Sequence, residues 1–127
     1  MIKMTRRQVA SFAAVAIVAI AAVFVASRTI GSSQPAITGE LVETFCYAKV
    51  RIGGVAHAAC GIECAKRGIP LAIVDAQSHT AYVLLPGRDK STVPPELIAQ
   101  MGHNVTIRGE IIERGGNNFI TVQSWKR

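Results

Sequence analysis

The chain has 127 residues, with 14 Lys or Arg, 8 Asp or Glu and a formal net charge of +6. This length allows one small domain and little else. Four of the basic residues precede Gly31, so from Gly31 onward ten basic residues face eight acidic ones, a net charge of +2. These charges form no basic cluster, and the composition therefore argues against nucleic acid as a partner.

An uncharged, apolar segment follows the basic start of the chain. Lys3, Arg6 and Arg7 precede residues 8–27, which are almost wholly Ala, Val, Ile and Phe. A helix of 18 such residues extends roughly 27 Å, close to the ~30 Å of a bilayer core. Residues 1–30 are therefore predicted to form either a single-pass membrane anchor or a cleaved signal peptide, and the sequence leaves both open. The start also resembles a short twin-arginine signal, which would export an already folded protein.

The N-terminal charges also predict where the rest of the chain resides. Positive residues that precede an apolar segment stay on the cytoplasmic side, so everything after Arg28 is expected outside. In a bacterium this places the protein at the inner membrane with its domain in the periplasm, or exported after signal cleavage. Residues 31–36 read as a polar linker and residues 37–127 as the exported domain. We expect the membrane as one partner, through the N-terminal helix, and a membrane or periplasmic redox protein as another.

The exported part reads as mainly β. Apolar alternation, turn residues and helix-end signals predict five strands and two short helices. This order, with a short helix between the third and fourth strands, is typical of a small OB-like five-stranded barrel, in which the cysteine-bearing helix is an insertion between the first two strands. The predicted strands are residues 37–45, 71–75, 80–85, 105–114 and 119–125, and the predicted helices are residues 55–67 and 95–101.

Three cysteines and a histidine form the main candidate site. On a helix, His57, Cys60 and Cys64 stand at i, i+3 and i+7, so their side chains share one face. Cys46, at the end of the first predicted strand, completes a Cys3His set that suits tetrahedral Zn, or Cu(I) with fewer ligands engaged, and suits Fe less well. The spacing is not that of a zinc ribbon, and no C-x-x-C-H motif for covalent haem is present.

Two other uses of the cysteines compete with a metal. Exported cysteines usually form disulfides, and a bond from Cys46 to Cys60 or Cys64 would contribute on the order of 3 kcal/mol but leave one thiol over. A Cys60–Cys64 bond suits a helix poorly, because Cβ atoms there lie about 5–6 Å apart and a disulfide wants roughly 3.5–4.5 Å. The third possibility is a redox-active thiol relay.

The remaining polar and aromatic residues carry weaker signals. His79 in a turn and His103 before a strand are expected to be solvated, and Glu63 with Lys66 reads as a solvated helix edge. Trp125 is expected to pack. No Ser/His/Asp set, paired carboxylates or phosphate loop appears, so we predict no catalytic residues.

The run from His57 to Pro70, preceded by a lone cysteine, resembles a group of small exported bacterial proteins that are mostly uncharacterised. Their pattern, H-x-x-C-x-x-x-C-x-x-x-G-x-P followed by a strand hairpin and a final strand pair, is similar over most of residues 37–125. The resemblance carries over Cys46, Cys60 and Cys64 as matching positions, together with His57. Gly61 stands where the pattern suggests alanine, and such a glycine is expected to loosen the helix.

These observations predict an exported, membrane-anchored accessory domain that binds a soft metal through Cys46, His57, Cys60 and Cys64, in support of a redox system. The alternative is a non-catalytic interaction module stapled by a disulfide from Cys46.

Overall fold

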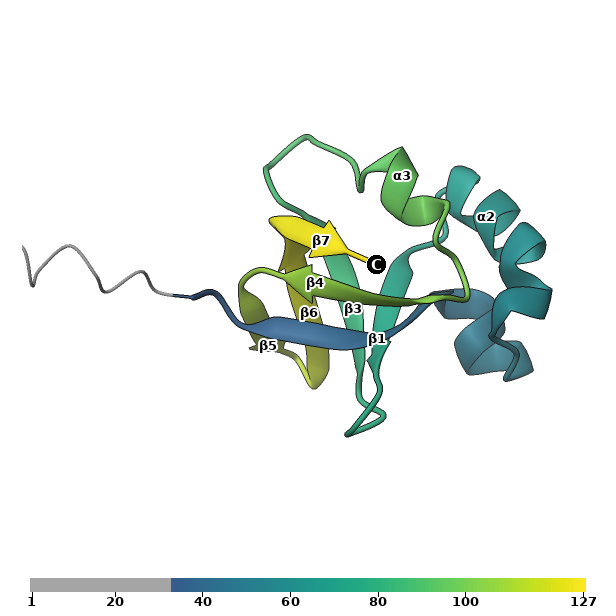
Figure 1. The fold of residues 1–127 in the computed structure, drawn as a ribbon, viewed down its shortest axis with the longest axis horizontal. Coiled ribbons are helices and arrows are strands. Elements are labelled where there is room, and N and C mark those ends of the chain that lie inside the picture. The colour runs from purple at the N-terminus through teal and green to yellow at the C-terminus, as the bar shows by residue number, and fades with distance from the viewer. Residues whose placement is uncertain (1–32) are drawn as a thin grey trace, which may run out of the picture. The chain divides into compact units, whose positions relative to one another are not determined.

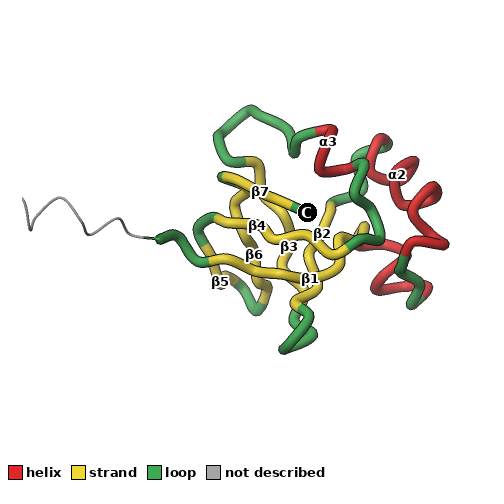
Figure 2. The backbone as a smooth tube through the Cα atoms, viewed as in Figure 1, coloured by secondary structure: helices red, strands yellow, loops and turns green. Residues whose placement is uncertain are grey.

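The computed structural model of the chain describes residues 33–127. The predicted anchor or signal helix lies outside these residues and stays a prediction. In the described range, no helix is long and apolar enough to cross a membrane. The fold is mainly β, as expected, with a sheet at one end and the helices gathered at the other (Figures 1 and 2).

The elements have the following bounds. The strands are β1 Ala36–Glu43, β2 Leu71–Asp75, β3 Ala81–Pro86, β4 Asn104–Arg108, β5 Ile111–Arg114, β6 Asn117–Val122 and β7 Ser124–Lys126. The helices are a π-helix η1 Cys46–Val50, a 3-10 helix η2 Val55–His57, α2 Ala58–Lys66 and α3 Pro95–Ile98.

The strands form one mixed sheet that is not closed into the expected five-stranded barrel. Their order is β5-β6-β3-β2-β1-β4-β7, and every neighbouring pair is antiparallel except β3 with β6. The barrel prediction was wrong: the last two expected strands each divide in two, at residues 109–110 and at Gln123, and the pieces pair as β4 with β7 and β5 with β6 at opposite ends of the strand order. A Cβ on Gly109 would lie 1.7 Å from the Thr121 carbonyl oxygen, so the backbones approach there more closely than any other residue allows.

The first three strands are confirmed. β1 pairs with β2 in the register Leu41 to Ile73, and β2 pairs with β3 as the expected hairpin. The turn between them is held by the Asp75 carboxylate, whose Oδ1 accepts the N–H groups of Gln77 and Ser78 at 2.7 and 2.8 Å. These bonds stabilise the charged carboxylate and lower the pKa of Asp75. The expected helix over 95–101 is shorter, a single α-helical turn.

One apolar core joins the sheet to α3. Leu97 of α3 is fully buried against the sheet, and Trp125 packs partly buried at the margin of the core, as expected. The core residues alternate along the strands, which is the pattern of a sheet with one buried face. They are Ile37, Leu41, Leu71, Ile73, Leu84, Leu97, Met101, Val105, Ile107, Ile120 and Val122.

Gly61 brings α2 close to the core instead of loosening it. The helix is regular from Ala58 to Lys66 and buries Gly61. A Cβ at this position would lie 2.7 Å from Met101 Cγ and 3.6 Å from Glu43 Cγ. The glycine therefore lets the cysteine-bearing helix lie directly over these two side chains, and the expectation that it loosens the helix was wrong.

Gly102 fixes the loop that leads into η2. Its φ is +77°, and its N–H donates to the Leu41 carbonyl oxygen at 2.8 Å. A Cβ on Gly102 would lie 2.5 Å from the carbonyl oxygen of Gly54, which is itself the acceptor for the His57 N–H at 3.0 Å. The close approach of Gly102 to Gly54 thus fixes the carbonyl oxygen to which the backbone N–H of His57 donates.

Replacing Gly102 tests this contact. Gly102→Ala combines a left-handed backbone with a backbone clash, so we expect a loss of unfolding free energy of about 2–4 kcal/mol. Gly116→Ala is the matched control, because Gly116 has φ +76° and open space around its Cα; it is expected to cost about 1–2 kcal/mol. Urea denaturation measures both, and equal losses for the two variants would contradict the role of the Gly54 contact.

Candidate metal centre

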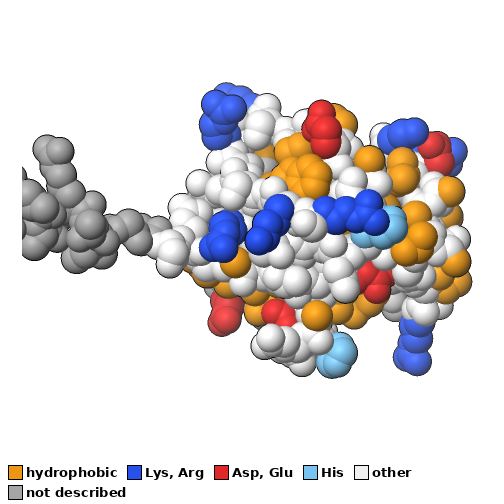
Figure 3. All heavy atoms as spheres, in the orientation of Figure 1, with side chains coloured by type: hydrophobic (Ala, Val, Ile, Leu, Met, Phe, Trp, Pro, Cys, Tyr) orange, Lys and Arg blue, Asp and Glu red, His pale blue; other side chains and the backbone are white. Residues whose placement is uncertain are grey.

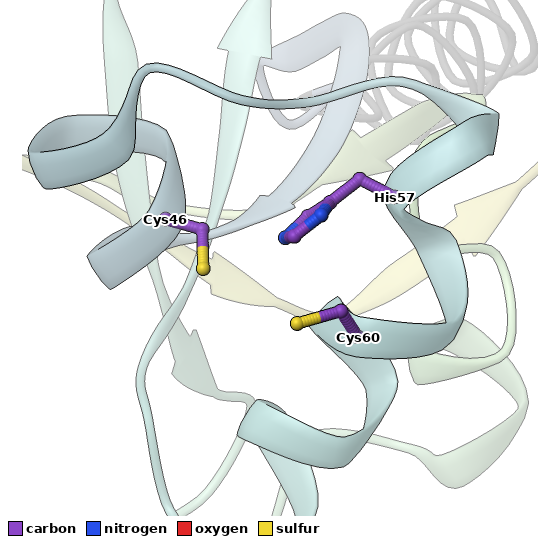
Figure 4. A group of neighbouring side chains, drawn as sticks. All are labelled: Cys46, His57 and Cys60. Carbon is purple, nitrogen blue, oxygen red and sulfur yellow. The ribbon is translucent and has the colours of Figure 1, made fainter.

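Four consecutive elements bring the candidate ligands together. The chain leaves β1 at Glu43, places Cys46 at the start of η1, ends η2 at His57, and carries Cys60 and Cys64 on α2. Figure 4 shows Cys46, His57 and Cys60 pointing toward one another from η1, η2 and α2. The sequence predicts Cys46 at the end of a strand. It lies instead on the π-helical turn η1, which faces α2.

The ligating atoms fall into two groups that share Cys46. One group is Cys46, His57 and Cys60, and the other is Glu43, Cys46 and Cys64. Within each group, one ligand atom per residue lies within 4.8 Å of the others. All four residues expected from the sequence are thus in the cluster, and each group offers the sulfur, nitrogen or carboxylate atoms that a metal ion binds.

Glu43 is the member of the cluster that the sequence analysis missed. Its side chain is buried, and its carboxylate accepts the N–H of Phe45 at 2.8 Å and of Cys46 at 2.7 Å. Oε1 lies 4.0 Å from His57 Nε2. A signal was present: Ile37, Gly39, Leu41 and Glu43 alternate along β1, and this period of two places the glutamate on the core face.

Two hydrogen bonds fix the backbone from which the His57 side chain extends. The Glu40 carboxylate accepts the N–H of Gly54, and the Gly54 carbonyl oxygen accepts the N–H of His57. Nε2 is buried without a hydrogen-bond partner among the described residues. A buried ring nitrogen without a partner is costly, and a metal ion or a water molecule would satisfy it.

The protein environment disfavours the free thiolates of Cys46 and Cys64. A hydrogen bond to Glu43, burial and the charge of that carboxylate raise the pKa of Cys46 to about 12. Burial, followed by the charge of Glu43, also raises the pKa of Cys64. Without a cation, these cysteines are therefore neutral thiols at pH 7, and a bound metal has to displace their protons.

No disulfide is present among the described residues. Cys46 is free and buried, Cys60 free and exposed, and Cys64 free and partly buried. The structure therefore shows the cysteines as candidate ligands, and it does not contain the staple that the alternative interpretation needs.

The other polar residues singled out in the sequence lie outside the two groups. His79 occupies the β2–β3 turn with φ +57°, and His103 Nδ1 lies 3.3 Å from Arg127 Nη2. Glu63 and Lys66 form an exposed ion pair at 2.9 Å, which lowers the pKa of Glu63. Such an exposed pair contributes little to stability, as expected for a solvated helix edge.

Comparison of the chain with protein-family models, with curated proteins and with solved structures found no match. The function is therefore inferred from the geometry of this site.

The exposure of the three thiols predicts the order in which they react. In the reduced, metal-free protein, Cys60 is expected to alkylate first at pH 7.5, Cys64 next and Cys46 last, because a buried thiol with a raised pKa offers little thiolate. Timed alkylation followed by peptide mass spectrometry measures the three rates. Equal rates in the folded chain, or faster reaction of Cys46, would contradict the arrangement.

Proposed function

We propose that this protein is an exported, membrane-anchored accessory domain that binds a soft metal ion for a redox system. The observation that carries the proposal is the convergence of two thiols and an imidazole nitrogen within 4.8 Å, from elements that other interactions hold in place. The thiols and imidazole would hold the metal, and the domain would supply a shielded, sulfur-rich environment for it.

The donor set selects among metals. Thiolate and imidazole ligands favour Zn²⁺ and Cu(I), whereas Mg²⁺ and Ca²⁺ require oxygen ligands. Iron is a weaker candidate, because the described residues offer three cysteines and not the four that common iron–sulfur clusters use.

Metal analysis of paired variants tests the proposal. The full-length chain, purified in detergent under reducing conditions, is expected to retain zinc or copper, and a variant with all three cysteines changed to serine is expected to retain neither. His57→Ala should weaken binding at least about tenfold, because it removes a ligand. His79→Ala is the matched control, since His79 lies in a turn outside the cluster, and its affinity should be unchanged.

Mass spectrometry and competition with a chromophoric chelator give the metal content and the affinity. Equal, negligible zinc, copper and iron in the wild type and the three-serine variant would overturn the proposal. The stapled-module alternative predicts instead one alkylated thiol before reduction and three after it.

The proposal includes a location and a partner. The domain would reside in the periplasm of a bacterium, either tethered by residues 1–30 or released after cleavage. Its metal site would face a membrane or periplasmic redox protein. What supports a partner is a set of exposed apolar side chains between Cys46 and His57 or next to them, at the end of the domain where hydrophobic side chains gather in Figure 3. They are Phe45, Val50, Ile52 and Val55.

A charge in the apolar segment tests the location. Ala14→Arg is expected to cost about 2.5–3.5 kcal/mol on membrane insertion and to reduce export for an anchor and for a signal alike. Fractionation with protease accessibility of the domain measures export. N-terminal sequencing of the wild type then separates a permanent anchor from a mature start near Ser32. Export unaffected by Ala14→Arg would argue against both forms.

A further inference from the structure

The cluster holds one more ligating group than a single tetrahedral ion uses. Five residues contribute, and they divide into two triads that have Cys46 in common. Building on the proposed metal-binding function, we propose that the site is a dinuclear centre in which the Cys46 sulfur bridges two divalent, thiophilic ions of the zinc class. One ion is held by Cys46, His57 and Cys60, and the other by Glu43, Cys46 and Cys64.

The geometry of the triads supports two ions. Ligand atoms around a tetrahedral zinc ion lie roughly 3.3–3.8 Å apart, given metal–ligand distances of about 2.0–2.3 Å. Each triad already fits within 4.8 Å, so a small contraction around each ion completes three of its four positions. A fourth position on each ion stays open to water or to a partner's group. A thiolate sulfur has enough lone pairs to bind both ions at once.

Charge balance points the same way. With both triads occupied, three thiolates and the Glu43 carboxylate carry four negative charges. With one divalent ion held by Cys46, His57 and Cys60, the Cys64 thiol keeps its proton, and two thiolates and Glu43 leave one negative charge uncompensated. Uncompensated charge beside a buried side chain is costly, and Glu43 is 2% exposed. Two divalent ions neutralise the set, whereas two Cu(I) ions would leave two negative charges.

Glu43 is already arranged as a ligand. Its carboxylate is oriented by the N–H groups of Phe45 and Cys46, which occupy one lone pair on each oxygen and leave the others available. In the described range, its ion-pair partner is His57, at 4.0 Å and charged only when protonated. A buried carboxylate without a Lys or Arg partner is the kind of group that a cation stabilises.

Native mass spectrometry of the full-length chain, reduced and titrated with Zn²⁺ in detergent, counts the ions. The wild type is expected to hold two zinc ions. Cys60→Ser and Glu43→Gln should each retain one, because each removes a ligand of a different ion, and Cys46→Ser should retain none. Glu63→Gln is the matched control for Glu43→Gln, since Glu63 lies exposed on α2, and it should retain two.

A measurement on the wild type guards against misfolded variants. Titration with Co²⁺ should give an electron paramagnetic resonance signal at one equivalent that weakens at two, because a bridging thiolate couples the two spins. One ion in the wild type, or a Co²⁺ signal that grows in proportion up to two equivalents, would overturn the dinuclear centre and leave the proposed function in place. No bound metal in any form would overturn both.

Discussion

The structure of the site depends on the buried carboxylate of Glu43. It accepts the N–H groups of Phe45 and Cys46, and these two bonds turn the chain from β1 into the π-helical segment that presents Cys46. The same carboxylate lies beside His57, and Gly61 allows α2 to cross directly over it. A residue without acceptor atoms at this position would leave a buried backbone N–H unpaired, so the negative charge is tied to the local fold as well as to ion binding.

Local patterns made much of the fold predictable, and contacts between distant residues account for the rest. The β2–β3 hairpin and the cysteine-bearing helix follow from periodicity and from Gly68 and Pro70, which act within a few residues. Gly109 meets Thr121 at the point where the fourth expected strand divides, and the place of Cys46 depends on a hydrogen bond to the Glu43 carboxylate. Neither contact has a signature in the spacing of the sequence. The alternation of buried residues along β1, by contrast, is visible in the sequence, and it identifies Glu43 as an inward-facing residue.

The position of the cluster along β1 bears on the proposed anchor. The linker joins the domain at Ala36, and the cluster lies beyond Glu43, at the other end of the strand. Under the proposed anchor, the tether would raise the concentration of the domain near the membrane. The exposed apolar side chains beside the cluster would then be available to the proposed partner.

Three thiols this close together cannot stay free in an oxidising compartment unless something protects them. In the periplasm they would pair as disulfides, and Cys46 is near enough to both other cysteines to compete for either. A metal bound before export would prevent this, because the sulfur lone pairs are then engaged and the ligands are shielded. Under the proposed export, loading would occur in the reduced cytoplasm, and the resemblance of the N-terminus to a twin-arginine signal fits export of a domain already folded around its metal. A signal of this kind would agree with the odd number of cysteines, because a domain that is exported folded and metal-loaded needs no disulfide partner for its third thiol.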